Sequence, residues 1–313
     1  MPYVMTSNNR SVQADGLYRL NPIDGVCVLV LVAYFLYFAL PSLSGGFEVD
    51  EMMNIYVHWR LGMLRSLWAN ICFWKGYGRP GGALYYLPIY HLFSLNPQPY
   101  RIVQITILAA SIPMVYYLAW LLASSRSVAF LGVLAFCYHA QLAKLVFLGS
   151  FIYDVLCGFF YFAALTYYIH IRERGRELRP VQVVAFLALY ICALNSKEMA
   201  ITLPVIVLAY ETLRCPRFSQ CKQFVQHKWR FATPALIAGL LTVPYIYGKT
   251  MSSYALARLY PYRPRYSWHQ FVTTNAKFVN ELLYLDDVFF PKGVLAMFPK
   301  GLLIIGGLFS FTL

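Results

Sequence analysis

The stretch GVCVLVLVAYFLYFALPSLSGGFEVDE (residues 25–51) runs from a long apolar segment, through a Gly-Gly turn, into two adjacent carboxylates. Its apolar part approaches the ~20 helical residues that cross a ~30 Å hydrocarbon core, so we expect a membrane span at 24–41. The polar lead of residues 1–23 is too long for a signal peptide, and the span is expected to remain as an anchor. The stretch predicts a membrane protein with an acidic pair, Asp50-Glu51, beyond its first span.

Apolar runs of this kind recur along the chain. Of its 313 residues, 59% are hydrophobic and only 12% are charged, with a mean hydropathy of +0.54, whereas soluble domains carry about 25% charged residues. The predicted spans are 24–41, 101–122, 128–148, 153–170, 181–195, 200–213, 231–248 and 294–313. We therefore predict an all-α integral membrane protein with about seven to eight transmembrane helices.

The net charge of +13 does not indicate a nucleic-acid partner, because the basic residues lie in loops between apolar spans and not along one soluble face. The sequence holds no P-loop, GxGxxG, HExxH or GxSxG motif, so no motif indicates nucleotide-driven or hydrolase chemistry. Cys215, Cys221 and His227 lack the spacing of a zinc site. We expect no metal and no cofactor.

Short basic loops set the expected orientation. Residues 171–179 carry four Arg against two Glu, and residues 214–230 carry five Lys or Arg and no acid. By the positive-inside rule, both loops and the N-terminal segment lie in the cytoplasm. If the spans alternate, the acidic pair, Asp154 and Lys197-Glu198 all lie on the opposite, outer side.

This orientation divides the chain into four parts. They are a cytoplasmic segment 1–23, a transmembrane core 24–248 that includes an outer loop 42–100, a second outer loop 249–293, and the start of a further, truncated span at 294–313. Residues 50–67 are expected to form an amphipathic helix on the membrane surface, with one apolar stripe of Met53, Val57, Leu61 and Leu64. Residues 81–95 favour an interfacial or re-entrant helix over a full crossing.

The pair of runs 181–195 and 200–213 is too long for one span and short for two. We expect a hairpin with Asn195-Ser196-Lys197-Glu198 at its tip. At 1.5 Å per residue each arm reaches only ~22 Å, so the tip is expected below the membrane surface, where it must line a wet cavity. Ionisable residues in such a place are costly and usually functional, although Lys197 and Glu198 can also satisfy one another as an ion pair.

The acidic pair Asp50-Glu51 follows the first span and the break at Gly45-Gly46. A carboxylate at the mouth of a membrane cavity can act as a general base, because partial desolvation lifts its pKa towards the working pH. The structural alternative is a helix start, where Asp and Glu are favoured. Asp154 opens the predicted span 153–170 and is equally open to both interpretations, as a site residue or as a helix cap.

The predicted outer loops are rich in basic side chains. They are His58, Arg60, Arg65, Lys75, Arg79, Arg101, Arg258, Arg263 and Arg265. Positive charge beside the bilayer suits an anionic lipid phosphate, which Arg binds with paired donors. Ordinary attraction to lipid headgroups explains the same pattern.

Several motifs occur in a characteristic order. They are FEVDE (47–51), GRPGGALYY (78–86), YRIVQ (100–104), IYD (152–154) and SKEMAITLP (196–204). In this order, over about residues 24–290, the chain resembles the polyprenyl-phosphate-dependent glycosyltransferases of the GT-C superfamily. The most similar branch is the group of protein O-mannosyltransferases and lipid A aminoarabinose transferases.

The resemblance implies a GT-C-like fold and an inverting transfer of a sugar from a polyprenyl-phosphate carrier. The acceptor would be a glycan, lipid or protein on the outer face, and the setting a bacterial inner membrane with the site facing the periplasm. Asp50 would be the base that deprotonates the acceptor, with Glu51 as its neighbour. The donor phosphate would contact Arg79, Lys197, Arg258, Arg263 and Arg265, and Asp154 and Glu198 would support the site.

Two other functions remain open at this point. A lipid or solute transporter would use buried ionisable residues as a translocation path, and it predicts internal inverted repeats, of which the sequence shows no convincing sign. A non-catalytic membrane scaffold or assembly subunit would use the same spans without a reaction.

Overall fold

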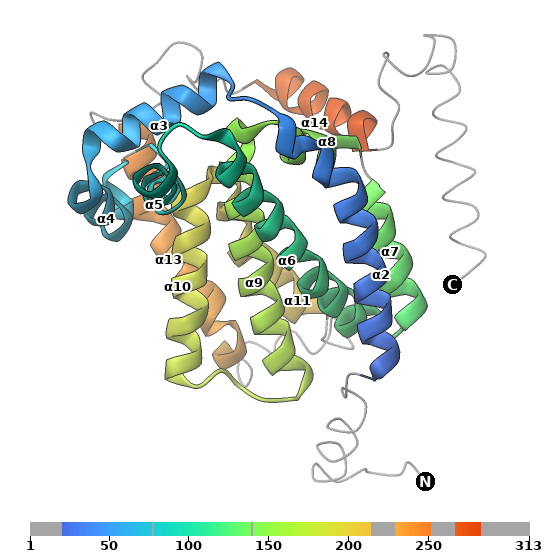
Figure 1. The fold of residues 1–313 in the computed structure, drawn as a ribbon. Helices are drawn as coiled ribbons and strands as arrows, with labels where there is room; N and C mark the ends of the chain where they lie inside the picture. Colours follow the sequence, from blue (N-terminus) through green and yellow to red (C-terminus); the bar gives the residue numbers. More distant parts are fainter. Residues whose placement is uncertain (1–20, 77, 139, 214–228, 252–266, 283–313) are drawn as a thin grey trace, which may run out of the picture. The chain divides into compact units, whose positions relative to one another are not determined.

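The computed structural model describes residues 21–76, 78–138, 140–213, 229–251 and 267–282. The chain divides into two compact units, residues 1–259 and 260–313, and each is described by itself. Every regular element within the described ranges is a helix (Figure 1). The prediction of an all-α protein is confirmed for this part of the chain.

Four helical segments of the first unit are long and apolar enough to cross a membrane. The first, Pro22–Ser44, comprises α2 (Pro22–Ala39) and the short helix η1 (Leu40–Ser44), and the second is α6 (Pro97–Ala123). The third, Gly149–Glu173, comprises η4 (Gly149–Phe151) and α9 (Ile152–Glu173). The fourth, Phe231–Met251, is most of α13 (Trp229–Met251). Two further apolar helices are shorter, Arg126–Cys137 and Pro180–Ser196. The chain is therefore a membrane protein, and the count of seven to eight spans stays a prediction.

Local sequence explains where several helices start and stop. Pro22, Pro97 and Pro180 each stand in the first turn of a helix, where the missing N–H costs nothing and the fixed φ suits the helix. Asn96 caps α6 by accepting a hydrogen bond from the Gln98 N–H at 3.2 Å. At Ser124, α6 ends with a left-handed residue, φ +53°.

Within the predicted span 128–148 the structure describes two helices, α7 (Arg126–Tyr138) and α8 (Ala140–Phe147). Residue 139 between them lies outside the described residues, so the crossing at 128–148 stays a prediction. α8 leads directly to Gly149, which lies against Glu51.

The chain turns at Lys197-Glu198 as the predicted hairpin requires, and the depth of this turn in the membrane stays a prediction. α10 (Pro180–Ser196) ends at an extended Lys197, and η5 (Glu198–Thr202) and α11 (Leu203–Leu213) follow. Near its end α11 places Glu211 against Arg172, near the end of α9. α11 thus returns to the end of the bundle from which α10 started, and the Lys197-Glu198 turn lies at the other end.

Short helices fill the predicted first outer loop. They are α3 (Val49–Leu61), α4 (Met63–Ile71), η2 (Phe73–Lys75), η3 (Pro80–Gly82) and α5 (Ala83–Phe93). Gly62, at φ +74°, separates α3 from α4, so the predicted helix 50–67 is two helices. Its predicted apolar stripe is exposed, whereas the opposite stripe of Glu51, Ile55 and His58 is buried. With 11 residues, α5 is ~17 Å long and agrees with an interfacial or re-entrant helix.

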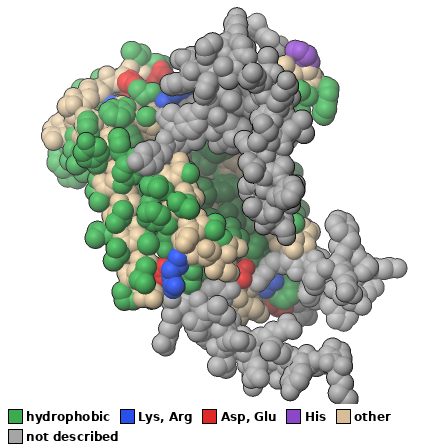
Figure 2. Space-filling view, turned by 90° about the vertical axis from the view of Figure 1, so that its right-hand side faces the viewer, with side chains coloured by type: hydrophobic (Ala, Val, Ile, Leu, Met, Phe, Trp, Pro, Cys, Tyr) green, Lys and Arg blue, Asp and Glu red, His purple; other side chains and the backbone are tan. Residues whose placement is uncertain are grey.

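Helix α9 packs against both α6 and α10 and forms the centre of the first unit (Figure 1). Several tyrosines in this core carry a hydroxyl that finds a partner: Tyr116 donates to Asp24 at 2.9 Å, and Tyr245 donates to the Leu194 carbonyl at 2.9 Å. Buried phenols need such partners to offset the loss of water. On the face drawn in Figure 2, hydrophobic side chains dominate the middle and charged ones lie towards the upper and lower edges, as expected for a surface in lipid.

The second unit is described only at α14 (Trp268–Leu282). Its described side chains, from Ser267 to Lys277, are all exposed. This helix falls within the predicted second outer loop, 249–293, whereas α13 continues to Met251 and passes the predicted core boundary at 248. Residues 1–20 and 294–313, and with them the predicted cytoplasmic segment and last span, lie outside the described residues.

Candidate functional site

The acidic pair opens α3, and its two carboxylates have opposite environments. Asp50 is exposed, and it makes no hydrogen bond or ion pair with any described residue. Glu51, one residue on, has no exposed surface. Both stand in the first turn of the helix, where negative charge is favoured by the helix dipole, so the position suits a helix start as well as a functional role.

Glu51 is paired with an equally buried arginine. Arg101, from the first turns of α6, places Nη2 at 3.1 Å from Glu51 Oε2 and at 2.7 Å from the Gly46 carbonyl oxygen. Three other buried polar atoms, Glu51 Oε1 and Arg101 Nε and Nη1, find no partner among the described residues. Burial raises the pKa of the Glu51 carboxyl, and the charge of Arg101 offsets only part of that effect.

The entrance of α9 is built around Glu51. Gly149 is so close that a Cβ placed on it would lie 2.1 Å from Glu51 Oε1, and only glycine allows this approach. Gln104 holds the preceding segment by donating to the carbonyls of Leu145 and Leu148 at 2.6 and 3.2 Å. The buried carboxylate is therefore enclosed by α3, α6 and the start of α9.

A second cluster of charges brings together residues from distant parts of the chain. Arg79 Nη2 lies 3.1 Å from Glu198 Oε2, and Lys249 Nζ lies 3.2 Å from Glu198 Oε1. Lys249 also donates to the Gly78 carbonyl. Burial alone would raise the pKa of Glu198, but the charges of Lys249 and Arg79 hold that pKa below its usual value. Glu198 therefore stays ionised and anchors both cations.

Lys197 and Asp154 form an ion pair next to this cluster. Asp154 gives the first turn of α9 no capping hydrogen bond, and the N-cap residue is Phe151, so the helix-cap interpretation of Asp154 was wrong. We call Arg79, Asp154, Lys197, Glu198 and Lys249 the ionic cluster. With three cations and two anions it carries a formal net charge of +1, and its side chains remain partly exposed, from 11% for Lys249 to 36% for Glu198.

His58 and Tyr153 lie between the buried carboxylate and the ionic cluster. His58 Nε2 is 3.0 Å from the Tyr153 hydroxyl, and the Arg79 guanidinium lies over the Tyr153 ring at 5.5 Å from its centroid. The His58 ring stacks on Tyr86 with centroids 5.7 Å apart. Burial lowers the pKa of His58 to about 4, so at neutral pH the imidazole is uncharged. It orients Tyr153 without adding charge.

The Arg79 loop is held tightly against the end of α10. A Cβ on Gly81 would lie 3.1 Å from the Asn195 backbone, and one on Gly82 would lie 2.4 Å from the Tyr153 ring. Asn195 Nδ2 donates to the Asn70 carbonyl at 2.8 Å, and Asn70 Nδ2 in turn donates to the Pro80 carbonyl at 2.8 Å. The Gly81-Gly82 pair thus permits a close contact with Asn195 and Tyr153, and this contact fixes the position of the Arg79 backbone.

The two centres are near neighbours along α9. Gly149, against Glu51, and Asp154, paired with Lys197, are five residues apart in the chain. At the rise of a helical chain their backbone positions are no more than ~10 Å apart.

Sequence reasoning found some of these residues and missed others. The structure brings together four predicted site residues, Arg79, Asp154, Lys197 and Glu198. It adds Lys249, which was placed in a loop because the apolar run ends before it, although Lys and Arg often finish a helix. The predicted phosphate contacts Arg258, Arg263 and Arg265 lie outside the described residues.

Among the described residues, no group of three or more His, Cys, Asp or Glu side chains could hold a metal ion. Comparisons with models of protein families, with curated proteins and with solved structures find no match for this chain. The interpretation of the site therefore depends on its geometry and on the sequence motifs.

Proposed function

We propose that the chain is a membrane glycosyltransferase of the GT-C type, which transfers a sugar from a polyprenyl-phosphate carrier to an acceptor by an inverting mechanism. The observation that carries the proposal is the ionic cluster, which gathers three cations in a partly exposed place. Asp50, at the start of α3, is exposed and has no described partner. The proposal includes a core of seven to eight spans in a bacterial inner membrane, with the site facing the periplasm.

The ionic cluster suits a phosphate that arrives and leaves. Glu198 holds Arg79 and Lys249, and Asp154 holds Lys197, so the cations are in place before any ligand binds. A lipid phosphate offers better acceptors than one shared carboxylate, because Arg binds phosphate with two parallel bonds. In the partly buried setting these cations also stabilise the charge that develops on the departing phosphate.

The reaction is a single displacement. The acceptor oxygen attacks the anomeric carbon and forms the new C–O bond, while the bond from that carbon to the phosphate oxygen breaks. The electron pair of the broken bond leaves with the phosphate, and the acceptor proton passes to Asp50. Attack from the face opposite the leaving group inverts the configuration, and a positioned base of this kind contributes about 10²–10⁴-fold.

Asp50 suits the role of base better than Glu51. Asp50 is exposed and has no described partner, whereas Glu51 is enclosed by Arg101 and Gly149. We assign Glu51 to positioning: its pair with Arg101 ties the start of α3 to α6 and fixes the direction in which Asp50 points. This division keeps the expected role of Asp50 as the base and gives its neighbour Glu51 a positioning role.

The test is a transfer assay with the purified full-length protein in lipid vesicles, supplied with a radiolabelled polyprenyl-phosphate sugar. We expect Asp50→Asn to lower transfer about 10²–10⁴-fold with unchanged membrane insertion. The matched control is Glu177→Gln, which removes an exposed carboxylate from the loop 171–179. Full activity of Asp50→Asn would exclude Asp50 as the base.

Donor binding is tested separately. We expect Lys249→Met to weaken the apparent affinity for the polyprenyl-phosphate donor, because it removes one cation of the cluster and leaves Glu198 with Arg79 alone. Arg65→Met is the control, since Arg65 is exposed and forms no ion pair with a described residue. If wild-type protein binds the donor and moves it across the bilayer without releasing the sugar, the function is transport and the glycosyltransferase proposal fails.

A further inference from the structure

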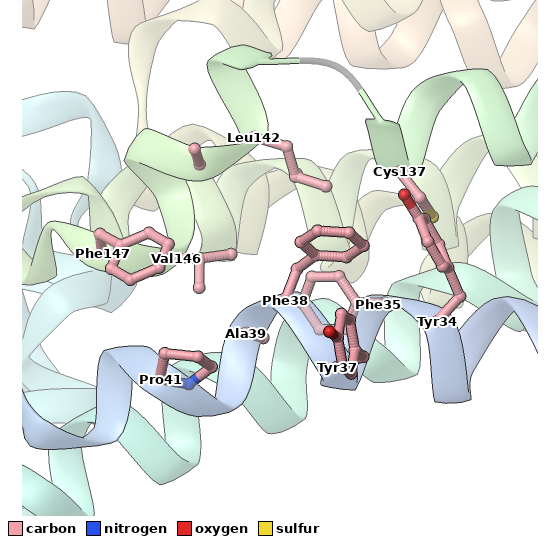
Figure 3. Close-up of a pocket in the computed structure, with 11 residues that line it drawn as sticks. Tyr34, Phe35, Tyr37, Phe38, Ala39, Pro41, Cys137, Leu142, Val146 and Phe147 are labelled. Carbon is pink, nitrogen blue, oxygen red and sulfur yellow. The ribbon is translucent and has the colours of Figure 1, made fainter.

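An apolar cavity of ≈ 540 Å³ lies between α2, α7 and α8, and none of the ionic cluster's residues lines it. Figure 3 shows Tyr34, Tyr37 and Phe38 of α2 on one side and Cys137 of α7 opposite. Val146 and Phe147 of α8 close the remaining side. The cavity thus draws on both helices that the structure describes within the predicted span 128–148.

The wall is mostly apolar. None of the described residues that line the cavity is charged, and Tyr34 and Tyr37 bring the hydroxyl groups. Its volume falls within the ~300–1,000 Å³ of ligand pockets and exceeds the voids of a packed protein interior, which are rarely larger than a water molecule. An apolar cavity does not hold ordered water, because water needs polar partners there. The wall therefore selects an apolar occupant.

The cavity is accessible from the surface that we assign to the bilayer. Tyr37 is 74% exposed, Phe38 51% and Phe147 46%, and all three line it. In a membrane protein such side chains face lipid chains, so a flexible hydrocarbon chain can enter sideways between α2 and α8. A narrow space between helices suits one chain better than a rigid helix.

One cation stands beside this apolar wall. Lys144 follows Ala143, which lines the cavity, and Lys144 is exposed and forms no ion pair with a described residue. A lysine at the edge of the bilayer lays its apolar stem along hydrocarbon and directs its ammonium towards the headgroups. A lipid whose chain fills the cavity would therefore meet a positive charge at the level of its phosphate.

We propose that this cavity binds one acyl chain of an anionic membrane phospholipid, whose phosphate pairs with Lys144. The site shares no residue with the proposed donor site: its wall is drawn from α2, η1, α7 and α8. The ionic cluster lies just before η3, at the turn between α10 and α11, at the start of α9 and near the end of α13. It does not depend on the glycosyltransferase proposal. The bound lipid fills the space between α2, α7 and α8.

The experiment is native mass spectrometry of the full-length protein after extraction in mild detergent. Phosphatidylglycerol, phosphatidylcholine and a polyprenyl phosphate are added in separate arms. We expect wild-type protein to retain one phosphatidylglycerol in preference to the other two. Ala143→Trp, which fills the cavity, should abolish retention, whereas Ala135→Trp, an exposed alanine on α7 that does not line the cavity, should not.

Lys144→Gln gives a test that does not risk the fold, because it changes an exposed side chain. We expect it to lower the preference for phosphatidylglycerol over phosphatidylcholine about fivefold, the contribution of one basic residue near an anionic surface. Added phosphatidylglycerol should also raise the apparent Tm of wild-type protein more than that of Lys144→Gln. Arg65→Gln serves as the control for loss of an exposed charge elsewhere.

Three results would overturn the proposal. Polyprenyl phosphate that displaces phosphatidylglycerol, and is itself excluded by Ala143→Trp, would assign the cavity to the donor chain. Equal lipid retention by wild type and Ala143→Trp would show that no lipid enters. A disulfide between Cys137 and a cysteine introduced into 294–313, formed in protein without bound lipid, would show that this segment fills the cavity.

Discussion

Two buried arginine–glutamate pairs stand near opposite ends of α9, and they are built differently. Arg172 binds Glu211 through two parallel bonds, Nε to Oε1 at 2.6 Å and Nη2 to Oε2 at 2.9 Å, and Tyr168 donates a third at 2.9 Å. Arg101 gives Glu51 one bond at 3.1 Å, and three polar atoms of the Glu51 pair find no partner within the described part of the chain.

We propose that the first pair is purely structural and that the second positions the start of α3. Buried polar groups are nearly always hydrogen-bonded, so unsatisfied ones call for an explanation. The Arg172–Glu211 pair locks α9 to α11, and the guanidinium also lies 3.7 Å from the Phe231 ring centroid of α13. The Glu51–Arg101 pair keeps unused hydrogen-bonding capacity in a fully buried place and ties the start of α3 to α6.

The largest effect is expected from breaking either pair. Arg101→Met and Arg172→Met each leave a buried carboxylate without its partner, which costs about 3–5 kcal/mol. Thermal and chemical unfolding of the purified protein measure this loss. Replacing both partners of a pair restores most of the stability, but we expect the two double variants to differ in transfer activity. Glu211→Leu with Arg172→Met keeps the activity, whereas Glu51→Leu with Arg101→Met loses it. Equal activity of the two double variants would remove the distinction.

The second-largest effect is expected in the pH dependence of folding stability, which depends on His58, in the same helix as Glu51. The pKa of His58 is about 4 in the folded protein and 6.5 in an unfolded chain, so between these values only the unfolded state takes up the proton. Stability therefore falls as pH decreases from 6.5 to 4, by about 1.4 kcal/mol per pH unit. Unfolding curves of wild type and His58→Gln across this range test it, and parallel pH profiles would contradict the assignment.

A smaller effect is expected from crowding Glu51. In Gly149→Ala the new Cβ would lie 2.1 Å from Glu51 Oε1, so the carboxylate or the start of α9 must move, at about 1–3 kcal/mol. Gly158→Ala is the matched control in α9, because nothing lies within 4 Å of its Cβ position; there alanine should be neutral or slightly stabilising. The measurements are the unfolding free energies and transfer rates of both variants, and equal values for the two would show that crowding Glu51 has no effect.

The smallest effect is expected at a third pair, Arg126–Asp24, joined at 2.9 Å. Arg126 is 43% exposed, so solvent screens the interaction, and Asp24 keeps the Tyr116 hydroxyl and the Asn21 N–H as donors. We expect Arg126→Gln to cost at most about 1 kcal/mol. A loss as large as that of Arg172→Met would mean that exposure does not separate strong from weak pairs in this protein.

Much of the candidate site was visible in the sequence because its residues sit at the ends of apolar runs. Lys197-Glu198 was found from a hairpin too short to cross the membrane, and Asp50-Glu51 from its place after the first span. Lys249 was missed because the end of a helix is the least certain part of such a prediction.

The sequence by itself determined that this is an α-helical membrane protein, because lipid leaves the backbone no other way to satisfy its hydrogen bonds than within helices or a closed barrel. It also placed the charged residues at the ends of the apolar runs. Only the tertiary structure decided which charges meet: that Glu51 turns inward to Arg101 while Asp50 stays exposed, and that Glu198 holds both Arg79 and Lys249. Such pairings depend on how helices distant in sequence pack, and no local pattern records that.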